Sequence, residues 1–413
     1  MKSMEMQFKQ TRLANGLTII TEVNQAAESM AMGFFVRTGS RDESAEVSGV
    51  SHFLEHMMFK GTDRRSAFDV NRDFDQMGAN YNAFTSEENT VYYGAVLPEF
   101  QAGLVDLLCD ILRPALRQED FDVEKNVIID EIARYEDQPQ FRVYDKIMSE
   151  HFDGHPLGNS ILGTVESVSA LKSEDMRAYF DRRYSPGNIT VAAVGKVDFD
   201  AFVDKVSRMC SHWKPYQVNR ATPPATARCG KKIIFDKKVV REHIGLMSPA
   251  PTSQDADRYA AQLAAAIIGD DTGSRLYYAL VEPAIADEAK TAFDPMDGAG
   301  TYLTFISTDP PRAAEALEIA QAELGKFMAD GPSDDELQAA KNKIASGATL
   351  TGELSMGRLT AVGFDWVYRK QYVPLADQIE ELFAVSKSDI LELVRRYDMT
   401  AMTVLALGPL EEL

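Results

Sequence analysis

Residues 52–56 read His-Phe-Leu-Glu-His, and the rest of the chain is organised around this short stretch. The two histidines are four residues apart, so on a helix their imidazoles share one face, about 6 Å apart along the axis, and both can reach one metal ion. Glu55 follows His52 by three residues, so its carboxylate leans toward the same face and can accept a proton from a water on that metal. The spacing therefore predicts a metal site with a base beside it.

The flanking residues decide between this interpretation and a chance match. A pattern with three fixed positions also arises by chance, and a histidine pair is often a solvated or capped feature of a surface helix. The neighbours of the motif are apolar: Phe53, Leu54, Met57, Met58 and Phe59. They suit a helix packed in a core, where imidazole and carboxylate groups need a partner such as a divalent cation. The order His-x-x-Glu-His reverses the commoner His-Glu-x-x-His zinc signature and forms a class of its own.

A tetrahedral site built from two histidines and a water lacks one protein ligand, and the helical pattern over residues 119–136 offers candidates. Glu124 and Glu131 are seven residues apart, nearly two turns, so they share a face. Glu131 as ligand with Glu124 as its supporting partner is physically sensible. The alternative, a solvated acidic face of an amphipathic helix, stays open on spacing alone.

Composition narrows the class of protein. At 413 residues and 45.8 kDa, with 45% hydrophobic residues, the chain is expected to form two or three domains. The net charge of −20 argues against nucleic-acid binding. No apolar run is long enough for a membrane span, and the first residues lack a signal-peptide pattern. The three scattered cysteines, Cys109, Cys210 and Cys229, read as reduced thiols, so a cytoplasmic location is expected.

The two halves of the chain carry an internal repeat. Arg-Arg-Tyr at 182–184 recurs 213 residues later at 395–397, and Met-Gly-Phe at 32–34 aligns with Ile-Gly-Leu at 244–246. Under this alignment the metal motif falls on Ala-Ala-Ala-Ile-Ile at 264–268, which has no ligand chemistry. We therefore expect a second copy that keeps the shape of the first and closes a chamber over it.

The repeat leads to a predicted fold and domain plan. The fold class is α+β, with two homologous α/β units, each a mixed sheet with helices packed on one face. The predicted metal-binding catalytic unit spans 1–215, a Pro/Ala/Thr-rich linker spans 216–230, and a homologous unit without a metal site spans 231–413.

The sequence resembles the pitrilysin or insulinase-type metallopeptidases, and especially the short-chain branch with mitochondrial processing peptidase subunits and bacterial processing proteases. The resemblance rests on the motif at 52–56, on Glu-Lys-Asn-Val-Ile-Ile-Asp-Glu at 124–131, on Asn-Ala-Phe-Thr-Ser at 82–86 and on Tyr-Ser-Pro-Gly-Asn at 184–188. It implies a fold of the clam-shell type.

The resemblance also implies a set of roles. His52, His56 and Glu131 would bind one Zn²⁺ per chain, Glu55 would be the general base, and Glu124 would support the site. Asn82, Ala83 and Phe84 would form the edge strand to which an extended peptide adds as a further strand.

One departure keeps two functions open. Many active relatives carry, after Ser-Arg-Leu in the second half, an Arg and a Tyr that help to hold the substrate carbonyl. Here Ser-Arg-Leu at 274–276 precedes Val-Glu-Pro-Ala-Ile-Ala-Asp-Glu at 281–288, so neither residue is in place. The first hypothesis is a zinc endopeptidase acting on unfolded peptides or presequence-like segments inside a closed chamber. The second is a peptide-binding or assembly subunit that retains zinc and needs a partner chain for efficient catalysis. The third is a metal-free, vestigial motif.

The expected assembly is a homodimer or a heterodimer with a related subunit. Neither a nucleic-acid nor a membrane partner is expected.

Overall fold

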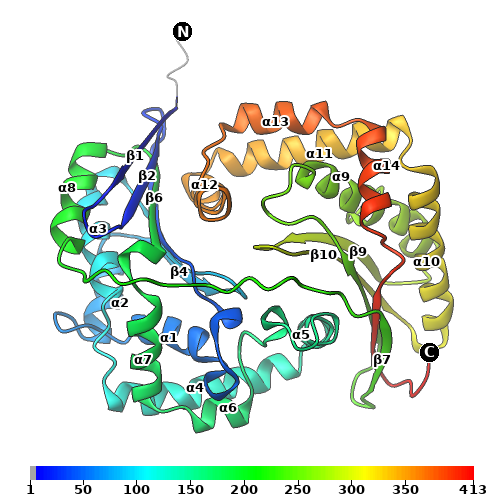
Figure 1. The fold of residues 1–413 in the computed structure, drawn as a ribbon, viewed down its shortest axis with the longest axis horizontal. Coiled ribbons are helices and arrows are strands. Elements are labelled where there is room, and N and C mark those ends of the chain that lie inside the picture. The colour runs from blue at the N-terminus through cyan, green and yellow to red at the C-terminus, as the bar shows by residue number, and fades with distance from the viewer. Residues whose placement is uncertain (1–5) are drawn as a thin grey trace. The chain divides into compact units, whose positions relative to one another are not determined.

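The computed structural model describes residues 6–413, which form two compact units (Figure 1). Unit 1 contains residues up to Ile132, then Asn159–Ala221 and Leu350–Val373. Unit 2 contains Ala133–Gly158, Thr222–Thr349 and Pro374–Leu413. Each unit is built from segments that are far apart in the sequence.

Unit 1 is built on a six-stranded mixed sheet with the order β1-β2-β6-β3-β5-β4. Its strands are β1 (Gln7–Arg12), β2 (Thr18–Val23), β3 (Met30–Val36), β4 (Asn80–Thr85), β5 (Thr90–Val96) and β6 (Ile189–Gly195). Strands β2 and β6 run parallel, with Thr18 opposite Thr190, and the other neighbours are antiparallel. The central strand β3 is buried along its whole length, which requires cover on both faces of the sheet.

Helices supply that cover. The helices of unit 1 are α1 (Val50–Met58), α2 (Ala67–Gln76), α3 (Gln101–Ile111), most of α4 (Gln118–Glu136), α6 (Val165–Ala170), α7 (Ser173–Arg183), α8 (Phe199–Cys210) and α12 (Ser355–Arg369). Helices α1, α3 and α8 contact the sheet from one side, as predicted, whereas α12 packs on β3 and β6 from the other side (Figure 1). Leu359 and Val362 of α12 join Phe35 and Ala192 of the sheet in one buried cluster. This second layer was not indicated by the sequence pattern.

Unit 2 repeats the topology. Its elements are α5 (Pro139–His151), β7 (Gly230–Phe235), β8 (Glu242–Pro249), α9 (Arg258–Gly269), β9 (Glu288–Pro295), β10 (Gly300–Thr308), α10 (Ala313–Asp330), most of α11 (Asp334–Gly352), α13 (Leu375–Ala384), α14 (Lys387–Arg396) and β11 (Thr403–Gly408). The order β7-β11-β8-β10-β9, with β7 and β11 parallel, reproduces β2-β6-β3-β5-β4 strand for strand. The prediction of two homologous α/β units is therefore confirmed.

Each half of the chain contributes one helix to the unit that the other half mainly forms. Helix α5, from the first half of the chain, packs on β8 and β11 of unit 2, and α12, from the second half, packs on the sheet of unit 1. The predicted division into 1–215, 216–230 and 231–413 concerned the copies of the repeat rather than these compact bodies, and it stays a prediction. None of the helices within residues 6–413 is both long and apolar enough to cross a membrane.

Candidate metal centre

Helix α1 carries the motif, and a buried carboxylate fixes where it begins. The helix is preceded by Gly49, whose φ of 89° is a left-handed conformation that glycine adopts readily. The Glu43 carboxylate accepts hydrogen bonds from the backbone N–H groups of Gly49 and Ser51, at 2.7 Å each. These two bonds satisfy backbone N–H groups that the first turn of a helix leaves without a partner. Burial raises the pKa of Glu43 to about 8, although the bonds from Ser51 and Gly49 act in the opposite direction.

The side chains of His52, His56 and Glu131 converge, and within residues 6–413 they form a group that suits a metal ion. Their donor atoms all lie within 4.8 Å of one another. Oε2 of Glu131 is 3.8 Å from Nε2 of His52 and 3.4 Å from Nε2 of His56. Ligand atoms at the usual 2.0–2.2 Å from a tetrahedral zinc ion lie about 3.4 Å apart, so the three residues fit this ion in spacing and in donor type.

Glu124 holds His56 from behind. Its Oε1 is 2.8 Å from Nδ1 of His56, and its Oε2 is 2.5 Å from Nζ of Lys60. An ionised carboxylate can only accept, so Nδ1 of His56 carries a proton, which leaves Nε2 as the nitrogen that would bind a metal. Burial alone would raise the pKa of Glu124, but the hydrogen bonds from His56 and Lys60 lower it.

The two histidines sit in different environments. Burial, and to a smaller extent the nearby His56, lowers the pKa of His52 to about 3. The His52 ring is therefore neutral, as a metal ligand must be. Burial opposes protonation of His56 too, yet the Glu124 hydrogen bond and nearby carboxylates give it a raised pKa. Nδ1 of His52 is buried and has no hydrogen-bond partner among the described residues. The orientation of the His52 ring therefore depends on packing contacts.

Glu55 points to the end of strand β4. Its Oε2 accepts a hydrogen bond of 2.6 Å from the Thr85 hydroxyl, and Thr85 is the last residue of β4. Burial raises the pKa of Glu55, while the Thr85 bond lowers it. A partly buried carboxylate with a raised pKa has the property expected of a general base.

Strand β4 lies at the edge of its sheet and, within the described chain, pairs only with β5. The predicted substrate residues Asn82, Ala83 and Phe84 lie on it, opposite Tyr93, Tyr92 and Val91 of β5. Asn82 is exposed, and its side chain accepts a bond from the backbone N–H of Ala83. The open side of an edge strand offers backbone groups to an added strand.

One loop, residues 39–43, ties α1 to the end of β4. The backbone of Gly39–Glu43 contacts the turn after β4 through Ser40 N–H to Ser86 O, 3.3 Å, and Arg41 N–H to Glu87 O, 2.9 Å. The turn is locked further by a buried ion pair between Arg41 and Glu88. The same loop ends at Glu43, which holds the start of α1. Sequence reasoning missed this anchor because residues 39–43 carry no motif of their own and act through contacts that only the fold brings together.

The counterpart of α1 in unit 2 has no ligands. Residues 264–268 lie in α9 and, apart from the half-buried Ala266, are buried apolar positions of the core. Arg275, which follows them, donates to both carboxylate oxygens of Glu336, at 2.7 and 3.0 Å, and to Gly331 O. Arg275 therefore has a structural role within unit 2.

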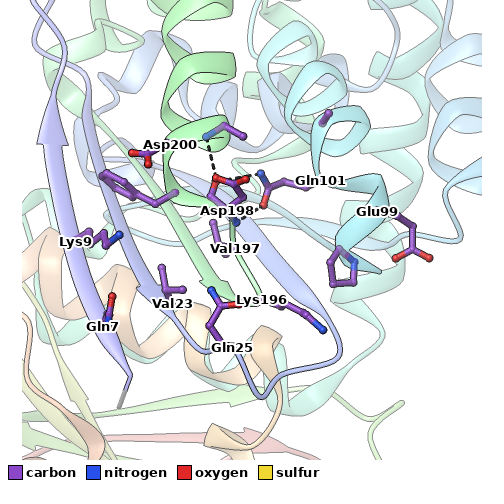
Figure 2. A pocket seen from close by; sticks show the side chains of 14 residues that line it. Gln7, Lys9, Val23, Gln25, Glu99, Gln101, Lys196, Val197, Asp198 and Asp200 are labelled. Carbon is purple, nitrogen blue, oxygen red and sulfur yellow. Dashed lines mark hydrogen bonds between the residues drawn. The ribbon is translucent and has the colours of Figure 1, made fainter. Parts of the chain in front are cut away.

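A cavity of about 720 Å³ lies elsewhere in unit 1, between β1 and the start of α8, and contains none of the predicted site residues (Figure 2). Its wall carries both signs of charge, with Lys9 and Lys196 near Asp198 and Asp200. Gln101 there bonds the backbone N–H and C=O of Asp198, which stabilises the turn before α8. The contact between Gln101 and Asp198 is structural, and none of the predicted metal ligands lines this cavity.

Comparison with known proteins identifies the family. The insulinase model, peptidase family M16, matches residues 18–165, and the peptidase M16 inactive-domain model matches residues 170–344. An uncharacterized zinc protease of Streptomyces coelicolor is 29% identical over 98% of this chain and 90% of its own length. The uncharacterized zinc protease YmxG of Bacillus subtilis is 28% identical over 94% of this chain and 95% of its own length.

Solved structures show the same fold. A protease from Helicobacter pylori superposes with a TM-score of 0.91 at 20% identity, covering 98% of this chain and 100% of that one. A peptidase M16 inactive-domain protein from Pseudomonas fluorescens gives 0.90 at 16% identity, covering 98% of each chain. The matches as a whole define a metallopeptidase of the zinc protease class. The chain belongs to the insulinase-type peptidase family, M16.

Proposed function

We propose that this chain is a zinc endopeptidase in which His52, His56 and Glu131 hold one Zn²⁺. The observation that carries the proposal is the meeting of two imidazole nitrogens and a carboxylate within 4.8 Å, on the side of α1 that also carries Glu55. A zinc ion in such a site supplies a Lewis acid that makes water a stronger nucleophile at neutral pH and polarises the scissile carbonyl.

The chain's own residues carry the proton. Glu55 takes a proton from the attacking water at a carboxylate oxygen, while the water oxygen forms the new bond to the carbonyl carbon. Glu55 then gives that proton to the amide nitrogen as the C–N bond breaks, so the products are a carboxylic acid and an amine, and the acid proton then passes to the amine or to solvent. Glu124 acts at a distance by fixing the His56 ring through Nδ1–H.

The substrate class follows from strand β4. A peptide that adds to its open edge must be extended, so folded proteins are excluded and unfolded or presequence-like segments are accepted. The backbone of Asn82–Phe84 would hold the added strand, and selection would depend on extended shape more than on sequence. A chamber closed by the second unit would strengthen this selection.

A second candidate is a peptide-binding or assembly subunit that retains zinc and relies on a partner chain. It is favoured by residues 281–288, where the expected Arg and Tyr are absent, and by Arg275, which is engaged with Glu336. A related subunit in a heterodimer, or a second copy in a homodimer, would then supply the missing groups. For both candidates we propose a cytoplasmic protein whose ligands are peptides, neither nucleic acid nor lipid.

The test compares the wild-type chain with Glu55→Gln. Zinc per chain and cleavage of a mixed pool of unstructured peptides are measured with and without a chelator. We expect near one zinc in both proteins and chelator-sensitive cleavage in the wild type alone. Unchanged cleavage by Glu55→Gln rejects Glu55 as the base, and zinc without cleavage in the wild type favours the partner-dependent subunit.

A further inference from the structure

The hydroxyl of Thr85 is the group through which the predicted substrate strand contacts the predicted base. Thr85 closes β4, directly after Asn82, Ala83 and Phe84, and its Oγ1 lies 2.6 Å from Oε2 of Glu55. Because the carboxylate is an acceptor when ionised, the hydroxyl donates. A hydrogen bond of this length to a charged acceptor is among the stronger ones in proteins.

We propose that Thr85 is a positioning residue that holds Glu55 in the orientation required for proton transfer. The inference rests on the proposed function and names a residue with no assigned role in it. Thr85 makes no contact with the three predicted metal ligands that the structure records; its recorded side-chain bond goes to Glu55 alone.

The position of Thr85 is itself fixed. It pairs with Thr90 at the end of the β4–β5 hairpin, and the turn between them is closed by Ser86 N–H to Asn89 O, 2.8 Å. Glu88 and Asn89 in this turn are buried and contact the Tyr368 hydroxyl, at 2.8 Å each. The hydroxyl is therefore presented to Glu55 by a part of unit 1 with little freedom to move.

Residues 39–43, here called the anchor loop, fix the distance between Thr85 and Glu55 by holding the segments that carry both residues. Its backbone bonds the turn that follows Thr85, and its Glu43 bonds the first turn of the helix that carries Glu55. One five-residue loop thus sets the distance between the base and the end of the substrate strand. The backbone of β4 that would hold an added peptide consequently ends at a fixed distance from Glu55.

The decisive variant is Thr85→Val, which replaces the hydroxyl by a methyl group of similar size and keeps a strong strand former. We expect kcat to fall about 10- to 100-fold, the loss typical of one hydrogen bond to a charged group, with KM and zinc content unchanged. Thr85→Ser retains a hydroxyl and should recover most of the rate. Thr360→Val, at an exposed position of α12, is the matched control and should equal the wild type.

A double variant tests whether Thr85 affects the rate through Glu55. If Thr85 acts only through Glu55, Thr85→Val adds no further loss in a Glu55→Asp background, where a carboxylate remains but is drawn back from the Thr85 hydroxyl. A kcat within twofold of wild type for Thr85→Val overturns the proposal, as does a parallel loss of zinc or a change confined to KM. A crystal structure of Thr85→Val gives a readout independent of activity, in which Glu55 should leave its present orientation. If the wild type cleaves no peptide, the proposed function fails. The role of Thr85 is refuted separately if Glu55 keeps its present orientation in the crystal structure of Thr85→Val.

Discussion

Nδ1 of His56 lies 2.8 Å from Oε1 of Glu124, and this contact decides which ring nitrogen faces Glu131. Glu124 is almost fully buried and also pairs with Lys60, so it is held at both oxygens. A carboxylate in this place fixes the tautomer of the ring and increases its basicity toward a metal.

Removing that carboxylate should weaken zinc binding. For Glu124→Ala we expect the zinc dissociation constant to rise about 10- to 100-fold, because the His56 ring loses its orienting partner. Competition with a chromophoric chelator measures it. Glu119→Gln, at an exposed position of the same helix, is the control. An unaltered zinc affinity in Glu124→Ala would show that His56 is ordered by other contacts.

The anchor loop should not tolerate a side chain at Gly39. A Cβ there would lie 2.2 Å from Ser86 O and 2.6 Å from Glu87 O, both backbone atoms, so the loop or the turn would have to move. We expect Gly39→Ala to destabilise unit 1 by about 1–3 kcal/mol in urea unfolding and to lower peptidase activity. Gly325→Ala, in α10 with open space around its Cβ, should instead be neutral or stabilise by up to about 1 kcal/mol. Equal stabilities for the two variants would contradict the close approach.

Burial of His151 predicts sensitivity to acid. Burial lowers the pKa of His151 to about 4, and its Nδ1 lies 2.9 Å from the Thr403 hydroxyl. Between pH 6.5 and 4 the unfolded chain binds a proton at this residue that the folded chain does not, so stability falls as the pH decreases through this range. The full loss is about 3 kcal/mol. His151→Gln should remove this part of the pH dependence in urea unfolding at pH 7, 5.5 and 4, and parallel curves for the two proteins would disprove it.

A buried ion pair should hold the exchanged helix α12 on the sheet of unit 1. Arg358 donates to both oxygens of Glu22, at 2.7–2.9 Å, and both side chains are buried. Because Arg358→Met leaves the buried Glu22 carboxylate without its counter-charge, although the Tyr372 hydroxyl still donates to it at 2.7 Å, we expect a loss of about 3–5 kcal/mol by chemical denaturation. Arg312→Ala, which breaks an exposed pair with Glu315, should cost at most about 1 kcal/mol. Similar losses for the two variants would contradict a special role of the pair.

Local patterns were sufficient to predict some parts of the molecule. The spacing of His52 and His56, the apolar flanks of α1 and the shared face of Glu124 and Glu131 are periodic signals, and the structure brings these four side chains together. The edge position of Asn82–Phe84 agrees with the role that the family resemblance implied.

Other parts could not be predicted, because they depend on contacts between distant segments. Glu43 lies in no motif, and Thr85 lies in the 82–86 motif without a role indicated by it, since each gains its role from a partner that only the fold brings close. The packing of α12 on β3 is equally invisible, because its apolar face would suit either sheet.

The exchange of α5 and α12 has a consequence for any attempt to divide the protein. Cut after Ala221, the first half would keep its sheet but leave Phe35 and Ala192 bare on one face, and the second half would leave Met247 and Leu405 bare in the same way. Each fragment would carry the helix that the other one needs. The halves are therefore expected to aggregate when produced singly and to regain solubility only when they are made in the same cell, as two chains that complete one another.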